Sequence, residues 1–340
     1  MMNRNKMNRV IFVFALLIFL LPTGMVGANN IGRTSIKAKL VGNYTLQQKN
    51  EIIDVLKSRL KSYADKEAIV NIENDSVFIT LNIEIDSMIC VDLLTKKGEF
   101  IITELYSSED IHHILLKIND LLKTNQFKDI REQIDAESSM DGDGESFENQ
   151  PLFRILKPNK PNSPYDRIVA HAMKKDSDLI AAIFNNELIK KHLPLDSHIA
   201  WFSEPEWSSS YYALFLVKGS PVITNRAIKA AKANVNDYGG QIVNIALKEE
   251  YHKAWEDLTA ANIGKPLSIM IDGVVVTAPL VYDVITGGKM SISGGLYFFK
   301  IKALAAILNN NLLNATIEIV GVEYEYPPIH YLLKLLKKLK

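Results

Sequence analysis

The chain has 340 residues, which is enough for two or three compact units, and its apolar share of 47% is normal for a globular protein. Its 39 basic residues balance its 39 acidic residues, which argues against a general nucleic-acid binder because such proteins carry a basic excess. The single cysteine, Cys90, excludes an internal disulfide framework and a thiolate metal cluster, and we interpret it as a small buried apolar residue.

The N-terminal segment, residues 1–28, is a predicted signal peptide. Arg4, Lys6 and Arg9 precede the apolar run Val10–Leu21, which is short for a membrane span. Small residues end the segment and fit the cleavage rule, so we expect export and removal of this segment. The alternative is that it is kept as a membrane anchor. Beyond it, the sequence contains no apolar run long enough to span a bilayer.

Residues 29–130 predict a first α+β subdomain. Its expected elements, in chain order, are a strand at 33–41, a helix from Thr45, strands at 68–72 and 77–82, a helix at 85–96 and a strand at 99–105. The Asn74-Asp75 pair predicts a hairpin between the second and third strands. This β-α-β-β-α-β order is typical of the ferredoxin-like arrangement. A further helix is expected at 109–124.

An acidic segment at residues 131–150 predicts a solvated linker, because acidic side chains stand there among serine and glycine. We also considered a calcium loop that starts at Asp141. Its sixth position is Ser146 rather than glycine and its twelfth is Leu152 rather than glutamate, so the pattern fails.

Residues 151–320 predict a second α+β subdomain. The expected strands lie at 168–173, 198–202, 211–218 and 241–247, and the expected helices at 177–188, 224–233 and 251–262. The helix at 224–233 is predicted from its alanine-rich filling. A strand at 316–326 could rejoin the first subdomain, which would make the second subdomain an insertion into the first.

Between these elements, the stretch from Gly264 to Gly294 has the densest turn signals. Asp272-Gly273 predicts a hairpin turn, and Pro279 is expected to stop strand pairing because proline has no N–H to donate. Gly287-Gly288 permits backbone conformations that other residues avoid. A short strand at 290–293 and a helix at 296–309 follow.

This stretch resembles the head of the first periplasmic domain of SecD, an accessory subunit of the bacterial protein-export machinery. The family pattern is roughly N-x-G-K/R-x-x-A-I-x-x-D-G-x-V-x-S-A-P, then I-x-G-G-x-x-x-I-S-G, then a helix. Its turn and strand positions are matched in order by Gly264, Asp272, Gly273, Ala278, Pro279, Gly287, Gly288, Ser293 and Gly294. The resemblance implies an α+β fold with a ferredoxin-like base subdomain and an inserted or appended α+β head subdomain, without the membrane helices of the family.

The C-terminal residues 321–340 are expected to contain a return strand and a basic amphipathic helix. In Ile329–Lys340, leucines share one helical face and lysines crowd the other. Such a helix can lie on an anionic membrane surface, or it can dock on its own domain and expose its lysines.

Aromatic residues cluster between residues 201 and 212. Trp201, Trp207 and Tyr212 are our candidate contacts for an extended, unfolded peptide, because they lie in or beside a predicted loop. The alternative places them in the core.

No catalytic motif is present: the sequence lacks a nucleophile elbow, a phosphate loop, a dinucleotide fingerprint and a zinc-protease motif. We therefore expect no enzyme activity, no cofactor and no metal. The resemblance implies an exported, periplasmic accessory of preprotein translocation that contacts unfolded polypeptides emerging from the translocon. Its expected partners are exported polypeptides and membrane subunits of the Sec translocon. The alternative is a stand-alone periplasmic binding or structural module without an export role.

Overall fold

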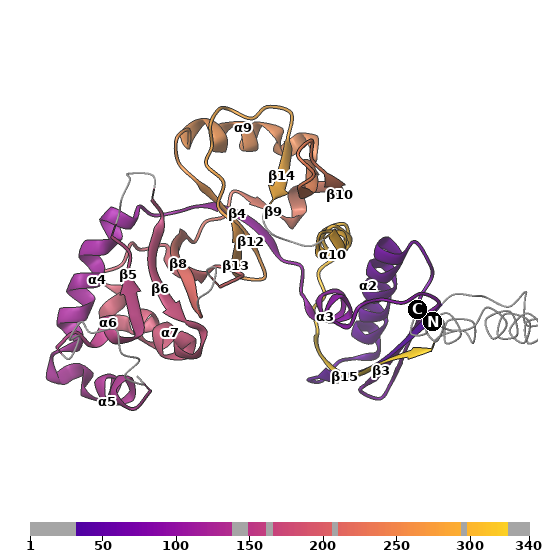
Figure 1. Cartoon of the computed structure of the whole chain (residues 1–340), viewed down its shortest axis with the longest axis horizontal. Helices are drawn as coiled ribbons and strands as arrows, with labels where there is room; N and C mark the ends of the chain where they lie inside the picture. The colour runs from indigo at the N-terminus through magenta and orange to yellow at the C-terminus, as the bar shows by residue number, and fades with distance from the viewer. Residues whose placement is uncertain (1–31, 138–148, 161–165, 206–209, 294–297, 326–340) are drawn as a thin grey trace, which may run out of the picture.

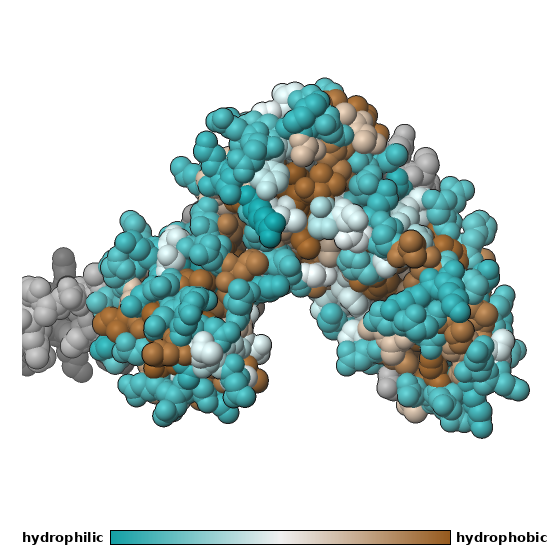
Figure 2. All heavy atoms as spheres, turned by 180° about the vertical axis from the view of Figure 1, so that it is seen from behind, coloured by the Kyte–Doolittle hydropathy of each residue, from teal (hydrophilic) through white to brown (hydrophobic). Residues whose placement is uncertain are grey.

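The computed structural model describes residues 32–137, 149–160, 166–205, 210–293 and 298–325. They form three lobes arranged as an arch (Figure 1). We call them the base (33–97 and 313–325), the central lobe (98–104 and 219–312) and the outer lobe (105–218). Seen from behind, the arch encloses an open hollow between the base and the outer lobe (Figure 2). The mixture of helices and antiparallel sheets confirms the predicted α+β class.

The base is an antiparallel sheet of order β15-β1-β3-β2, packed against two helices of its own. Its elements are β1 (Arg33–Val41), α2 (Leu46–Ala64), β2 (Ile69–Glu73), β3 (Ser76–Leu81), α3 (Ser87–Thr95) and β15 (Thr316–Glu325). Thr45 and Gln48 form a capping box that starts α2. This β-α-β-β-α-β succession confirms the ferredoxin-like base, and everything between α3 and β15 is an insertion into it.

The strand predicted at 99–105 was expected to complete the base, and this expectation is wrong. The observed strand, β4 (Phe100–Glu104), pairs with strands of the central lobe instead. The free side of β1 is taken by β15, which pairs along its full length from Arg33 opposite Glu325 to Val41 opposite Thr316. The chain turns out of the base at Gly98, whose φ of +83° favours glycine.

The outer lobe is a four-stranded sheet of order β5-β6-β8-β7 covered by helices. Its strands are β5 (Leu156–Pro158), β6 (Ile168–Met173), β7 (Ser197–Trp201) and β8 (Tyr211–Lys218); its helices are α4 (Ser108–Leu122), α5 (Lys128–Glu137), α6 (Pro151–Ile155), α7 (Ser177–Asn185) and α8 (Glu187–Lys190). The boundaries predicted at 130 and 150 stay a prediction. In the structure, α5 extends across position 130 and packs in one core with α4 and α6. Ile134 of α5 is fully buried in that core.

The central lobe contains two sheets, of order β13-β12-β4-β9 and β10-β11-β14. Its elements are β9 (Ile223–Thr224), β10 (Ile228–Val235), β11 (Gln241–Leu247), α9 (His252–Ala261), β12 (Leu267–Ile271), β13 (Val274–Thr277), β14 (Lys289–Ser293) and α10 (Phe298–Leu308). The helix predicted at 224–233 is wrong, since β10 occupies most of it. Pairing with β11 and packing against α10 outweigh the helix propensity of its alanines.

Helix α10 belongs to two cores at once. Its side facing the central lobe consists of Ile301, Ala305 and Leu308. Its side facing the base consists of Ala303, Ala306 and Ile307. Because both sides are buried, α10 fastens the base to the central lobe by apolar packing.

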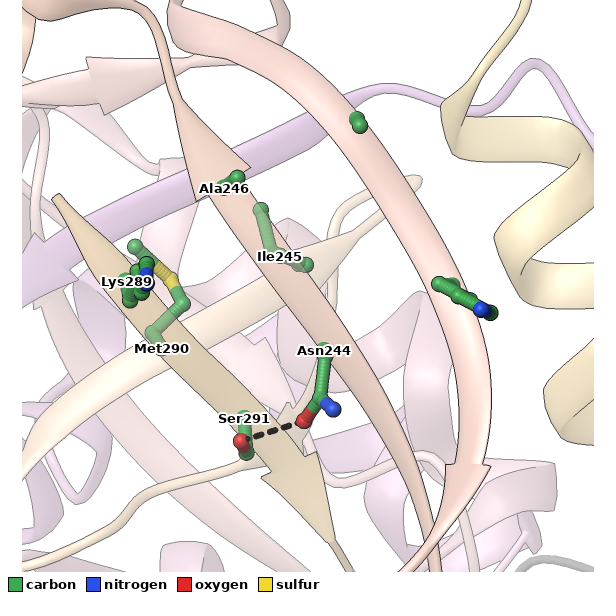
Figure 3. A pocket seen from close by; sticks show the side chains of 8 residues that line it. Asn244, Ile245, Ala246, Lys289, Met290 and Ser291 are labelled. Atoms are coloured by element: carbon green, nitrogen blue, oxygen red, sulfur yellow. Dashed lines mark hydrogen bonds between the residues drawn. The ribbon is translucent and has the colours of Figure 1, made fainter.

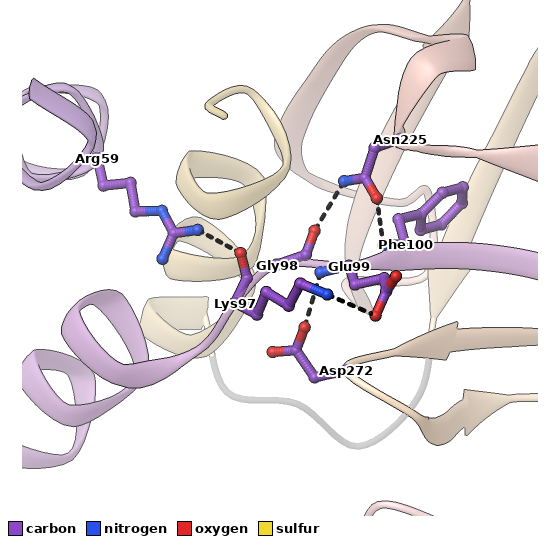
Figure 4. Close-up of polar contacts among 7 residues, drawn as sticks. All are labelled: Arg59, Lys97, Gly98, Glu99, Phe100, Asn225 and Asp272. Atoms are coloured by element: carbon purple, nitrogen blue, oxygen red, sulfur yellow. Dashed lines mark hydrogen bonds and ion pairs between the residues drawn. The ribbon is translucent and has the colours of Figure 1, made fainter. Parts of the chain in front are cut away.

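The chain leaves the base through residues 97–100, and the buried side chain of Arg59 holds this crossing from the base side (Figure 4). Its two terminal nitrogens donate, at 2.5–3.4 Å, to the carbonyl oxygens of Leu93, Lys96, Lys97 and Asn311. Asn311 lies on the returning chain, so one guanidinium ties both connections. Burial lowers the pKa of Arg59 to about 10, with the charge of Asp272 opposing the shift, so it stays protonated at neutral pH.

Side chains of the central lobe bind the same segment, residues 97–100, from the opposite side (Figure 4). Asn225 Oδ1 accepts the N–H of Phe100 at 2.7 Å, and its Nδ2 donates to the carbonyl of Gly98 at 2.7 Å. Asp272 Oδ1 accepts the N–H of Glu99 at 2.7 Å, and the Asp272 N–H donates to the Glu99 carbonyl at 2.9 Å. The crossing therefore has side-chain partners in both lobes.

Replacing Arg59 by methionine should lower the free energy of unfolding by about 2–5 kcal/mol, because buried carbonyls lose their charged donor. Lys57→Met, on the exposed side of α2, is the matched control and should change stability by no more than about 0.5 kcal/mol. Urea titration of both variants measures the difference. Equal midpoints would contradict the role given to Arg59.

Cys90 lies fully buried in the core of the base, where burial raises the pKa of its thiol to about 12. Because the thiolate is the reactive form, we expect no reaction with Ellman's reagent at pH 8 in the native chain. In 8 M urea (about the concentration that unfolds most domains) the thiol should react fully. Rapid labelling without denaturant would contradict the buried placement.

Candidate functional site

The Asp272-Gly273 turn joins β12 to β13 as predicted. Both residues have positive φ, +52° and +79°, which is the conformation of a tight two-residue hairpin turn. Asp272 also accepts the N–H of Glu99, so this turn is anchored on the crossing from the base. Its role here is structural: it fixes the hairpin against β4.

The Gly287-Gly288 pair turns the chain into β14. Its φ values are +74° and +61°, and the Gly288 carbonyl accepts the N–H of Leu247 at 2.8 Å. A Cβ atom at Gly288 would overlap the ring of His252, whereas no atom lies within 4 Å of one at Gly273. Gly288 is thus limited by backbone conformation and by space, and Gly273 by conformation alone.

The other residues of the resembling stretch also support the backbone. Gly264 has a φ of +75° and donates its N–H to Val281 at 2.8 Å. Pro279 accepts the N–H of Leu267 at 3.1 Å, so pairing continues past the proline through its carbonyl. Ala278 packs beside the apolar cluster between the central and outer lobes. Ser293 is exposed at the end of β14, and Gly294 lies outside the described residues.

The structure brings two of the three candidate aromatics together. Trp201 ends β7 and Tyr212 lies on β8, and their rings meet edge to face with centroids 6.3 Å apart. Both side chains are half-buried, and Trp201 packs against the core of the outer lobe. The ammonium of Lys174 lies 4.7 Å from the centroid of the Trp201 ring. Trp207 lies outside the described residues.

A cleft of about 800 Å³ opens beside Trp201, between α7, α8 and the strand β7. Its lining is mainly apolar, from Ala181, Phe184, Leu193, Leu195, Ile199 and Trp201. Leu195 is fully exposed to solvent at the mouth. Tyr212 is not part of this lining, so it supports the tryptophan from beside the cleft. The helical pattern of α7 was predicted, but nothing local in the sequence indicated the cleft itself.

Polar side chains share the lining of the cleft: Asn185, Glu187, Lys190, Lys191, Ser197 and His198. Lys190 pairs with Glu187 at 3.3 Å, and Lys191 is exposed. Desolvation by its surroundings lowers the pKa of His198, and the charge of Asp196 opposes the shift. The apolar part of the cleft can accept apolar side chains of an extended peptide, while its charged residues lie beside them.

Part of this chain is similar to a known protein family. Residues 203–315 match the family described as SecDF, P1 head subdomain. The resemblance to SecD is confirmed. The match contains the whole stretch from Gly264 to Gly294, together with β8 and every element of the central lobe except β4. Trp201 lies just before its start.

Individual SecD proteins resemble the chain over this part. The protein translocase subunit SecD of Acidaminococcus fermentans is 35% identical over 104 residues, which are 31% of this chain and 25% of that protein. SecDF of Thermus thermophilus is 31% identical over 104 residues, 31% of this chain and 14% of that protein. The matches thus span a quarter or less of these relatives. A crystal structure of SecDF in a super-membrane-facing form has 16% identity and a TM-score of 0.46, covering 96% of this chain and 36% of that one.

Two predicted segments, the signal peptide at 1–28 and the basic helix at Ile329–Lys340, lie outside the described residues and stay predictions. Within the described ranges, no helix has both the length and the apolar character needed to cross a membrane. The same ranges contain no group of His, Cys, Asp or Glu side chains that could hold a metal ion.

Valine at Gly288 should lower the free energy of unfolding by about 1–3 kcal/mol through backbone strain, with a further loss from the clash with His252. Gly273→Val should show the strain alone and lose less. The second variant Gly288→Val/His252→Ala removes the clash and should recover part of the difference. Urea titration tests all three, and equal midpoints for Gly288→Val and the unmodified chain would show that the turn is misplaced.

Proposed function

We propose that this chain is a periplasmic, SecD-like accessory of preprotein translocation that contacts unfolded polypeptide leaving the translocon. The match of residues 203–315 to the SecDF P1 head carries the proposal, and the relatives are named as protein translocase subunits. Membrane subunits of the Sec translocon are its proposed partners, and no enzyme activity is proposed.

The cleft beside Trp201 is the proposed polypeptide contact. An unfolded chain presents apolar side chains in no fixed order, so a suitable surface needs apolar area and few specific polar groups. The cleft supplies the apolar area through Phe184, Ile199 and Trp201, and two of its charged side chains, Glu187 and Lys190, pair with each other. Trp201 offers a large aromatic surface whose position is held by Tyr212 and by the core behind it.

Leu195→Ser tests this contact without disturbing the core, since Leu195 is fully exposed. With permanently unfolded, reduced and carboxymethylated lactalbumin as ligand, we expect affinity to fall by about threefold to tenfold while the melting temperature stays unchanged. Fluorescence anisotropy of the labelled ligand measures binding. Leu46→Ser, at another exposed leucine, on the base helix α2, is the matched control and should change neither quantity.

Two outcomes would contradict the proposal. Undetectable binding by the unmodified chain would remove polypeptide contact altogether and favour a stand-alone structural module. Equal losses for Leu195→Ser and Leu46→Ser would place the contact somewhere other than the cleft. Co-purification with translocon membrane subunits tests the partner, and its absence would leave a periplasmic binding module without an export role.

A further inference from the structure

The small sheet of the central lobe has two outer edges, and they differ. Strand β10 and strand β14 form these edges, with β11 between them. At the β10 edge, the side chain of Asn309 from α10 pairs with the backbone of Ala231. Its Oδ1 accepts the Ala231 N–H and its Nδ2 donates to the Ala231 carbonyl, both at 2.7 Å. At Ala231 this edge is therefore capped by an amide that pairs as a neighbouring strand would.

The β14 edge presents its main-chain groups outward. The Leu247 N–H donates to the carbonyl of Gly288, and the register continues with Ile245 opposite Met290. Since hydrogen-bonded pairs alternate along an antiparallel ladder, Met290 and Ile292 bond inward to β11. The N–H and carbonyl groups of Lys289 and Ser291 then point away from the sheet. Within the described residues, no group forms a hydrogen bond with these outward groups.

A shallow hollow of about 450 Å³ lies over the solvent face of this sheet, next to the open edge (Figure 3). Its lining combines the small side chains of Ala230, Ala246 and Ser291 with the longer ones of Lys232 and Lys289. Ser291 lies opposite Asn244 and donates its hydroxyl to the Asn244 side-chain oxygen at 2.7 Å, as Figure 3 shows. The hollow beside Ser291 leaves space on this face for a side chain of an added strand.

Two other edge strands carry features that discourage pairing. The base edge strand β15 contains Glu318, Glu323 and Glu325, and its ladder with β1 is broken by a bulge at Lys37/Ala38. The outer edge of β13 is already used, because the Ser203 N–H donates to the Val275 carbonyl at 2.9 Å. Compared with β15, β14 has a single charged residue, Lys289, and no bulge in its pairing.

We propose that the open edge of β14 binds an extended polypeptide as a fourth strand of this sheet. The occupant follows from the chemistry: outward donors and acceptors recur every two residues, about 6.8 Å apart, which matches the main chain of an extended peptide. The inference rests on the proposed contact with unfolded polypeptide and adds a second, main-chain contact to the cleft. Because main-chain groups make the contact, it demands little of the peptide sequence.

Ser291→Pro tests the edge in the full chain. Proline there removes the outward N–H and leaves the inward bonds of Met290 and Ile292 in place, a position where edge strands tolerate proline. We expect affinity for reduced and carboxymethylated lactalbumin to fall about tenfold. Ser291→Ala is the matched control, since it loses only the hydroxyl bond to Asn244, and it should bind like the unmodified chain. Equal binding by folded Ser291→Pro would overturn the inference and leave the cleft as the contact.

Amide hydrogen exchange of the unmodified chain gives a second test that does not depend on a variant folding. On binding the same ligand, the amides of Lys289 and Ser291 should exchange more slowly by NMR, while the already bonded amide of Met290 changes little. Binding without protection at Lys289 and Ser291 would overturn the edge contact but not the proposed function. Failure of the unmodified chain to bind would overturn both.

Discussion

The buried guanidinium of Arg59 is the interaction on which the arrangement of the lobes depends. It donates to the carbonyl of Lys97 on the outgoing chain and to that of Asn311 on the returning chain. From the opposite lobe, Asn225 and Asp272 bond to the same outgoing segment. Two connections that lie far apart in sequence are therefore held by one set of polar contacts, and α10 adds apolar packing beside them.

This junction places the proposed contact surfaces away from the base. The base carries the acidic edge strand β15, whereas the inserted lobes carry the cleft beside Trp201 and the open edge of β14. The cleft offers apolar side-chain contacts and the edge offers main-chain bonds. Together they suit a ligand that has no fixed fold, because neither surface reads a particular sequence.

Local sequence patterns predicted correctly those elements whose conformation depends only on neighbouring residues. The Asp272-Gly273 turn and the capped start of α2 at Thr45 are examples, since each needs only residues within one turn. The sequence could not reveal the partners of Arg59 and Asn225, because these are backbone groups from distant segments. It misassigned β10 for a related reason: pairing with β11 and packing on α10 decide its conformation, and neither is visible in its alanines. The cleft likewise depends on how α7, α8 and β7 meet.

Site-specific photocrosslinking in cells tests most directly whether this chain contacts polypeptide in transit. A benzophenone amino acid at Leu195 would report on the cleft, and the same group at Leu46 on the base would report on random collisions. With a secretory precursor stalled in the translocon, we predict an adduct between the precursor and the chain at Leu195 and none at Leu46. Absence of an adduct at Leu195, or equal adducts at both positions, would contradict the account.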